Sequence, residues 1–278
     1  MPTDRAAVMA IVNRTPDSFF DAGATYADRA AIDAVHRAVD EGADIIDIGG
    51  VKAGVGPTVD VAEETRRVVP FIERVRASYP DLVISVDTWR SPVAAAACEA
   101  GADLINDTWA GADPGLAAVA AQFGAGIVCS HTGGAAPRTN PHRVSYPDVV
   151  AAVITETTAA ATRMVAAGVP RAGVLIDPTH DFGKNTWHGL ELVHRTRELV
   201  ATGWPVLMAL SNKDFVGETL DLPVDQRLEG TLAATAIAAW QGAAIFRAHQ
   251  VLPTRRVVEM AAAIAGIRAP LAARRGLV

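Results

Sequence analysis

The apolar residues of this chain fall into short runs rich in Val and Ile, and each run is followed by an alanine-rich stretch with helical spacing. Gly, Pro, Asp or Asn bounds each run, as is typical of buried strands that end at turns. There are eight such runs, at residues 8–12, 45–48, 82–86, 104–105, 126–129, 174–176, 205–209 and 244–246. Helices are predicted between them, for example over residues 27–40, 61–76, 92–100 and 149–167.

Glycines stand at the ends of three of these predicted helices. Gly42, Gly101 and Gly168 each follow the last residues of a helical stretch. Helices commonly end at a residue in the left-handed conformation, which glycine adopts without steric cost. We therefore expect positive φ angles at these three positions.

The runs are apolar on both faces, which favours a buried parallel sheet over half-exposed antiparallel strands. Eight strand-and-helix units without a break in composition predict an α/β fold, a single (β/α)₈ TIM barrel over residues 1–278. Residues 268–278 then form a frayed end, and residues 133–147 form a long loop over the barrel mouth. The alternative is an open doubly wound sheet, but no Gly-x-Gly-x-x-Gly follows the first run.

Composition narrows the class of protein. The chain has 278 residues, half of them apolar and 5% aromatic, which suits one barrel of roughly 250 residues. The formal net charge of −6 argues against a nucleic-acid or membrane-surface partner. Cys98 and Cys129 lack metal or secretory spacing, so both are expected to be buried in a reducing compartment. With no signal segment or membrane span recognised in the sequence, we expect a cytoplasmic protein.

Polar residues follow all eight runs. In a barrel of this kind the chemistry sits at the carboxyl ends of the strands. Any single Asp or Asn there is explained as a turn former or helix cap, but eight polar ends on one face are not. The residues are Asn13, Asp47, Asp87, Asn106, His131, Asp177, Lys213 and Arg247 with His249.

Two groups emerge from the chemistry of these side chains. The carboxylate and amide oxygens of Asp87, Asn106 and Asp177, with Lys213 as counter-ion, suit the edge of a guanine-like or pterin-like heterocycle. The second group comprises Asn13, Arg247 and His249 on the first and eighth strands, which become neighbours when the barrel closes. These residues suit a phosphate or an Mg²⁺-bound diphosphate.

Three other features of the sequence give weaker indications of function. Residues 131–134 begin the long loop and either wall the pocket or, for His131, cap an element. The remaining histidines have neither His-x-x-x-His nor His-x-His spacing, so a zinc site is not expected. No Gly-x-Ser-x-Gly elbow indicates a serine hydrolase.

Several segments together resemble dihydropteroate synthase, from about residue 8 to about residue 265. They occur in the family's order and their combination is specific. The segments are IVNRTPDSF (11–19), GADIIDIGG (42–50), ISVDT (84–88), GADLIND (101–107), DP (177–178) with FGK (182–184), and SNK (211–213) with Phe215 and Gly217.

That family joins 6-hydroxymethyl-7,8-dihydropterin diphosphate to p-aminobenzoate and releases diphosphate. The resemblance implies that Asp47, Asp87, Asn106, Asp177 and Lys213 bind the pterin, and that Asn13, Arg247 and His249 bind diphosphate. It further implies Asn13 as an Mg²⁺ ligand whenever a diphosphate is bound. Asp17 matches the mobile aspartate of the first loop, and we expect Asp17, Asp87 and Lys213 to take part in catalysis. Preorganised charge would stabilise the developing pterin methylene cation.

The departures from the family cluster at the p-aminobenzoate site. Where the family reads Glu-Ser-Thr-Arg-Pro-Gly, residues 51–56 read VKAGVG, and where it reads Ser-Arg-Lys-Ser, residues 211–214 read SNKD. Two arginines are therefore missing, and an acid is added. A like charge at about 4 Å costs about 4 kcal/mol before screening at an effective dielectric constant near 20. We expect an altered acceptor site at Lys52, Phe182, Asn212 and Asp214.

The leading hypothesis is a dihydropteroate synthase paralogue with a retained pterin-diphosphate pocket and little or no activity with p-aminobenzoate. The alternatives are an active synthase in which Lys52 or Lys184 replaces an arginine, a non-catalytic pterin- or phosphate-binding protein, and a transferase with a neutral or cationic amine acceptor. Sulfone or sulfonamide ligands are expected to fit the remaining cavity. The resemblance also implies a homodimer, with residues 228–239 as a candidate contact helix.

Overall fold

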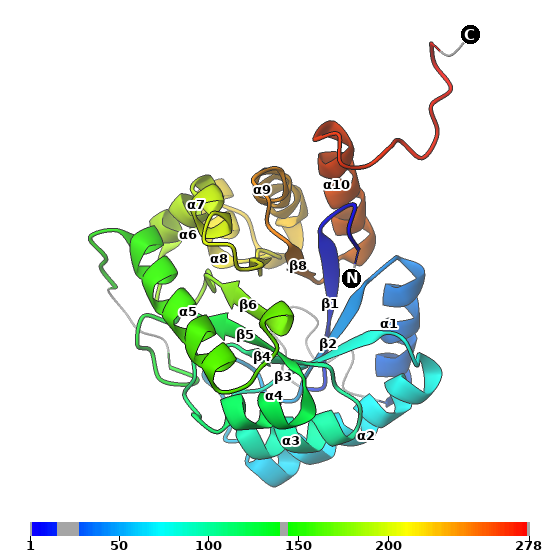
Figure 1. The fold of residues 1–278 in the computed structure, drawn as a ribbon. Helices are drawn as coiled ribbons and strands as arrows, with labels where there is room; N and C mark the ends of the chain where they lie inside the picture. The colour runs from blue at the N-terminus through cyan, green and yellow to red at the C-terminus, as the bar shows by residue number, and fades with distance from the viewer. Residues whose placement is uncertain (1, 16–27, 140–143, 277–278) are drawn as a thin grey trace.

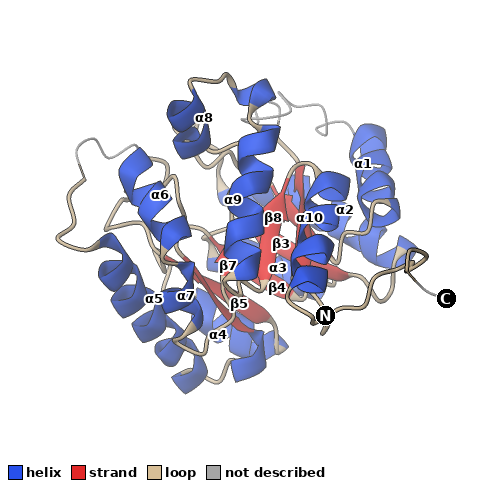
Figure 2. Cartoon of the chain, turned by 90° about the horizontal axis from the view of Figure 1, so that it is seen from above, coloured by secondary structure: helices blue, strands red, loops and turns tan. Residues whose placement is uncertain are grey.

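The computed structural model describes residues 2–15, 28–139 and 144–276. Parallel strands form a ring in the centre, and helices surround it (Figures 1 and 2). The strands are β1 (Ala7–Asn13), β2 (Ile45–Gly49), β3 (Val83–Asp87), β4 (Leu104–Asp107), β5 (Gly126–Ser130), β6 (Val174–Asp177), β7 (Leu207–Met208) and β8 (Ile245–Ala248).

Helices connect successive strands and cover the outside of the ring (Figure 1). Two of them begin at acids that satisfy free backbone N–H groups: Asp60 caps α2 and Asp148 caps α5. The helices are α1 (Asp28–Asp40), α2 (Val61–Ser78), α3 (Ser91–Glu99), α4 (Leu116–Phe123), α5 (Val149–Ala166), α6 (Thr186–His194), α7 (Thr196–Val200), α8 (Asp214–Leu220), α9 (Leu228–Trp240) and α10 (Val251–Ile264).

The sheet order is β6-β5-β4-β3-β2-β1-β8-β7, and all of its pairs are parallel. The ring closes between β6 and β7 through a single parallel bridge, Ile176 with Val206, where Ile176 N donates to Pro205 O at 3.0 Å. The predicted TIM barrel is confirmed, and the open sheet is excluded. The seventh strand is shorter than predicted at both ends, and at its start Pro205 has no N–H to contribute to the ladder.

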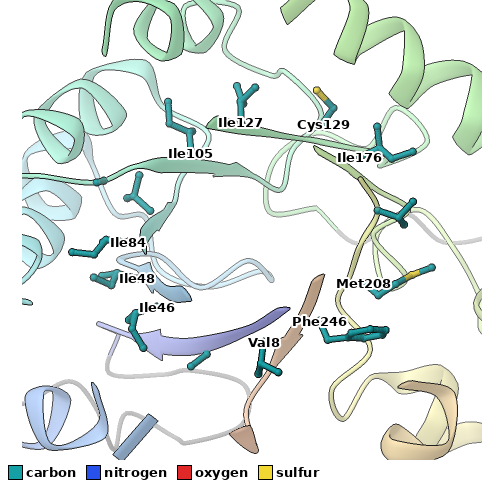
Figure 3. Close-up of a cluster of buried hydrophobic side chains, with 14 of the residues drawn as sticks. Val8, Ile46, Ile48, Ile84, Ile105, Ile127, Cys129, Ile176, Met208 and Phe246 are labelled. Carbon is teal, nitrogen blue, oxygen red and sulfur yellow. The ribbon is translucent and has the colours of Figure 1, made fainter. Parts of the chain in front are cut away.

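Side chains alternate between the inside and the outside of the barrel wall. Those pointing outward pack against the helices and form the larger apolar cluster, which includes Val8, Ile46, Ile84, Ile127 and Phe246 (Figure 3). Those pointing inward near the amino ends form a smaller second cluster. The barrel interior is therefore filled with apolar side chains at one end, which leaves the other end for chemistry.

Several local predictions can be compared with the fold. Gly42, Gly101 and Gly168 have φ angles of 90°, 109° and 101°, as expected for helix ends. Cys98 and Cys129 are both buried, as predicted. Helix α10 ends at Ile264, and the described part of the tail beyond residue 268 is not helical and leaves the barrel in Figure 1.

Helix α5 bears on the expectation that the chain has no membrane span. By length and composition alone this 18-residue helix passes for a membrane span, although none was expected. In the fold it packs against β5 and β6 of the barrel. A core helix of a soluble protein meets the same criterion, and the packing of α5 places it in that class.

Candidate pterin site

In two strands of the barrel, the inward-facing side chains change from apolar to polar toward the carboxyl end of the strand. In β2, Ile45 is followed two residues later by Asp47, and β8 repeats the change with Ile245 and Arg247. The alternation of a strand puts both residues of each pair on the same face. The polar side chains therefore lie as one layer on top of the apolar filling.

Arg247 lies at the centre of this layer. Its Nε donates to Asp47 Oδ2 at 2.6 Å, and its Nη2 donates to Asp87 Oδ2 at 2.9 Å. Ser85 Oγ donates to Asp47 Oδ1 at 2.6 Å, and Asn106 Nδ2 donates to Asp47 Oδ2 at 3.1 Å. Four strands thus contribute to one hydrogen-bonded network, with Asp47 fully buried beneath it.

Burial changes the titration of the acids in this layer. It raises the pKa of Asp87 to about 7, although Arg247 opposes the shift, and Asp47 adds to it. Burial also raises the pKa of Asp177 to about 6, against the hydrogen bond from the Thr179 N–H. A carboxyl with a pKa near 7 can donate or accept a proton at neutral pH. Asp87 is therefore suited to the polar edge of a heterocycle.

Asn106 offers a further contact. It is 1% exposed, and among the residues that the structure describes its Oδ1 has no hydrogen-bond partner, whereas its Nδ2 is held by Asp47. Buried amide oxygens are rarely left unpaired. A ligand N–H would satisfy this oxygen, as the resemblance predicts for the pterin edge.

The predicted diphosphate group is brought together at the seam between the first and last strands. β1 pairs with β8, and Asn13, Arg247 and His249 all line one cavity of about 270 Å³. Burial, followed by Arg247 and Lys213, lowers the pKa of His249 to about 3, so its imidazole is neutral. Arg247 is already bound to two carboxylates. The group is assembled, but much of its positive charge is compensated.

Lys213 has a carboxylate partner that the sequence did not indicate. Its Nζ lies 2.9 Å from Asp181 Oδ2. Its Nζ also lies 5.9 Å from the centre of the Phe182 ring. Burial raises the pKa of Asp177, and the charge of Lys213 opposes that rise, as expected of the predicted counter-ion. Asp181 was not predictable from the strand ends, because it stands four positions beyond Asp177, within the loop after β6.

Similarity to known proteins identifies the family of the chain. Residues 9–249 match the family described as pterin binding enzyme. The chain is 66% identical to "Inactive dihydropteroate synthase 2" of Mycobacterium tuberculosis over 99% of its own length and 87% of the relative's. The chain belongs to the pterin binding enzyme family. The resemblance to a divergent copy of dihydropteroate synthase is confirmed.

Solved structures agree with this assignment. A dihydropteroate synthase of Yersinia pestis, in complex with a sulfonamide drug, is 35% identical and superposes with a TM-score of 0.90, covering 96% of this chain and 97% of that one. A Mycobacterium tuberculosis structure is 57% identical with a TM-score of 0.76, and each chain is covered to 97%. The family fold therefore extends over nearly the whole chain.

The residues of the predicted altered acceptor site do not all reach the cavity. Lys52, Phe182 and Asp214 line it, whereas Asn212 is fully buried and its Nδ2 donates to Gln250 Oε1 at 3.2 Å. Asn212, which stands where the family has an arginine, thus lies buried in the turn after β7 and does not line the cavity.

Asp214 is also less repulsive than its position in the sequence suggests. It begins α8 and accepts a hydrogen bond from Arg227 Nη1 at 2.9 Å, which forms an ion pair at the rim of the cavity. Its negative charge is therefore partly compensated.

Lys184 does not face the cavity. Its Nζ donates to the carbonyl oxygens of His131, Thr179 and Phe182 at 2.8, 3.1 and 2.9 Å. Burial lowers the pKa of Lys184 to about 7. Its ammonium joins the loops after β5 and β6, so Lys184 is a structural residue and does not replace a lost arginine.

The two loops predicted to cover the site are described in part. Asp17 lies outside the described residues. In the loop after β5, His131 and Thr132 are buried while Gly133 and Gly134 are exposed, and Thr139 lines the cavity. Arg138 Nη1 donates to Pro57 O at 2.8 Å, which ties this loop to the segment after β2.

Proposed function

We propose that this chain binds a pterin or pterin diphosphate in the barrel mouth and has little or no dihydropteroate synthase activity with p-aminobenzoate. The buried network of Asp47, Asp87, Asn106 and Arg247 supports pterin binding. The name of the Mycobacterium tuberculosis relative, which calls that protein inactive, supports the loss of the reaction.

One observation carries the second part of the proposal. Three cations line the cavity, and both Lys213 and Arg247 are already paired with carboxylates. An aromatic acid needs an available cation, because its carboxylate loses water on binding. Within the described part of the chain, this leaves Lys52 as the only lining cation without an ion pair.

Isothermal titration would test both parts. The protein is titrated first with 6-hydroxymethyl-7,8-dihydropterin diphosphate and then with p-aminobenzoate, and released diphosphate is measured in parallel. We expect saturable heat from the pterin and neither heat nor diphosphate release from the acid. Turnover of p-aminobenzoate, or growth of a synthase-deficient strain that carries this chain, would contradict the proposal.

An active synthase remains the second candidate because Lys52 lines the cavity with no carboxylate partner. A lysine supplies a point charge where an arginine supplies a two-pronged contact. If that candidate is right, Lys52→Ala abolishes turnover of p-aminobenzoate while pterin binding persists. A transferase that uses a neutral amine would instead release diphosphate with such an acceptor.

We propose Mg²⁺ only together with a diphosphate. The described residues contain no group of three His, Cys, Asp or Glu side chains that could hold a metal alone. Asn13 would contribute one oxygen, and phosphate oxygens and water would complete the octahedral shell that Mg²⁺ requires. The ion would neutralise the departing diphosphate.

Two further partners follow from the same reasoning. The Yersinia pestis relative was solved with a sulfonamide drug, and we propose that this cavity accepts such ligands, which lack a full carboxylate. We also propose a homodimer through α9 and α10, supported by their exposed apolar residues Ile237, Trp240, Met260 and Ile264. Two free buried cysteines are consistent with a cytoplasmic protein.

A further inference from the structure

The Asp181–Lys213 ion pair stands in the wall of the cavity, which is also lined by the predicted pterin contact Asp87 and by Asp214 of the predicted acceptor site. Both side chains line the cavity, and they are 25% and 20% exposed. Such a pair is partly desolvated, so it is screened less than a surface pair. Lys213 therefore presents little net positive charge to a ligand.

The loop that carries Asp181 is fixed by its neighbours. Thr179 has a φ angle of 52°, an unusual conformation for a β-branched residue, and its N–H donates to Asp177 Oδ1 at 2.7 Å. Gly183 lies so close to the Thr132 carbonyl that an added Cβ would be 2.1 Å from that oxygen. Lys184 binds three backbone carbonyls across the same loop. The Asp181 carboxylate is thus held in place before any ligand arrives.

We propose that Asp181 is a specificity-determining residue, an internal counter-ion that neutralises Lys213 and biases the cavity against an aromatic acid as acceptor. An anion must compete with a carboxylate that is already in position. A neutral or cationic amine meets no such competition. The inference deepens the proposed function, because it names the residue that turns the same cavity away from an aromatic acid.

The test variant removes the negative charge of Asp181 and keeps the size of its side chain. Asp181→Asn is titrated with inorganic diphosphate and with p-aminobenzoate at low and at physiological salt. We expect at least a tenfold gain in affinity for each anion, and the gain should shrink as salt rises. Asp181→Glu, which retains the charge, should stay near the wild-type affinity. In Asp181→Asn/Lys213→Met the gain should disappear.

Two control variants show whether the gain in anion affinity is specific to Asp181. Asp225→Asn removes the same charge from an exposed site outside the cavity lining and should leave anion affinity within twofold of wild type. Asp214→Asn removes an acid that Arg227 already neutralises and should give less than a threefold gain. An unchanged anion affinity in Asp181→Asn, or an equal gain in Asp225→Asn, overturns the inference.

The proposed function is tested separately in the same samples. Titration with neutral 6-hydroxymethylpterin reports on the pterin site. If the wild type does not bind it, the proposed pterin binding is contradicted, whereas the inference about Asp181 is not. Thermal unfolding of each variant confirms the fold. If Asp181→Asn does not fold, Asp181→Ser takes its place with the same expected gain.

Discussion

At the scale of single residues, Arg247 is the group on which the polar layer depends. Two carboxylates, Asp47 and Asp87, converge on it from neighbouring strands. Although burial opposes its charge, the two acids hold the pKa of Arg247 above the ordinary value. The network is stable only while cation and anions are buried together, since one partner left alone would be an uncompensated buried charge.

Arg247→Met should therefore destabilise the protein by about 3–5 kcal/mol, as is typical when one partner of a buried ion pair is removed. Urea unfolding at pH 8 measures the change. The loss should be smaller at pH 6, because Asp87 is then protonated more readily. Arg66→Met, which removes the exposed partner of Glu63, is the control and should have a much smaller effect. Equal losses in the two variants would contradict this account.

The buried side chain of His180 makes the stability of the fold depend on pH. It is 2% exposed, and its ring nitrogens have no hydrogen-bond partner in the described part of the chain. Burial, followed by Lys184 and Lys213, lowers its pKa to about 3. The unfolded chain binds a proton below about pH 6.5 that the folded chain refuses, so this residue costs stability as the pH falls from about 6.5 toward 3.

His180→Phe removes that penalty and retains an aromatic ring beside Phe215. Relative to wild type, its free energy of unfolding should improve by about 1.4 kcal/mol per pH unit between pH 6 and pH 4. Urea unfolding across this range gives the difference. Phenylalanine in place of the exposed His194 should leave the two curves parallel. Parallel curves for His180→Phe would show that the buried ring is protonated in the fold.

Individual residues also show what the sequence could and could not reveal about the site. Asn106 and Arg247 were predictable because strand ends meet on one face of a barrel. The pairing of Lys213 with Asp181 was not, because it depends on the path of a loop and on side-chain direction across 32 positions of sequence. The pairing of Asp214 with Arg227 was not predictable for the same reason.

At the scale of elements, the loops after β5 and β6 meet at Gly183. Tyr146 donates its hydroxyl to Gly183 O at 2.6 Å, and Gly183 itself packs on the Thr132 carbonyl. This contact sets the direction of the segment that carries Asp181 and Phe182 into the cavity. Strand boundaries were predictable from apolar runs, whereas this contact was not, because no local pattern encodes a meeting of two loops.

Gly183→Ala tests the contact. Its φ angle is 60°, and the new Cβ would lie 2.1 Å from Thr132 O, so left-handed strain and overpacking together should cost about 2–5 kcal/mol. Gly124→Ala is a matched control, because Gly124 has a φ angle of 64° and open space around it. The control should cost about 1–2 kcal/mol from strain alone. Thermal unfolding measures both, and a cost at Gly183 no greater than at Gly124 would mean that the loops separate freely.

At the scale of the whole molecule, the outer surface of the barrel carries an apolar patch on α9 and α10. Helices α9 and α10 pack on each other and expose large apolar side chains near their carboxyl ends. Trp240 and Ile267 line the same hollow beside Ala239 and Ala265. An apolar patch built from neighbouring elements is typical of an interaction surface rather than of scattered exposed residues.

The proposed homodimer can be tested on that patch. In a C₂ dimer each substitution enters the interface twice, so a double variant Ile237→Glu/Met260→Glu would place four acids in the contact. We expect wild type to sediment as a dimer and this variant as a monomer in analytical ultracentrifugation. Trp187→Glu, on the exposed face of α6, should remain dimeric. The affinity for 6-hydroxymethylpterin should be the same in monomer and dimer, because the cavity lining contains no residue of α9 or α10. A monomeric wild type would instead leave this apolar patch available to another protein.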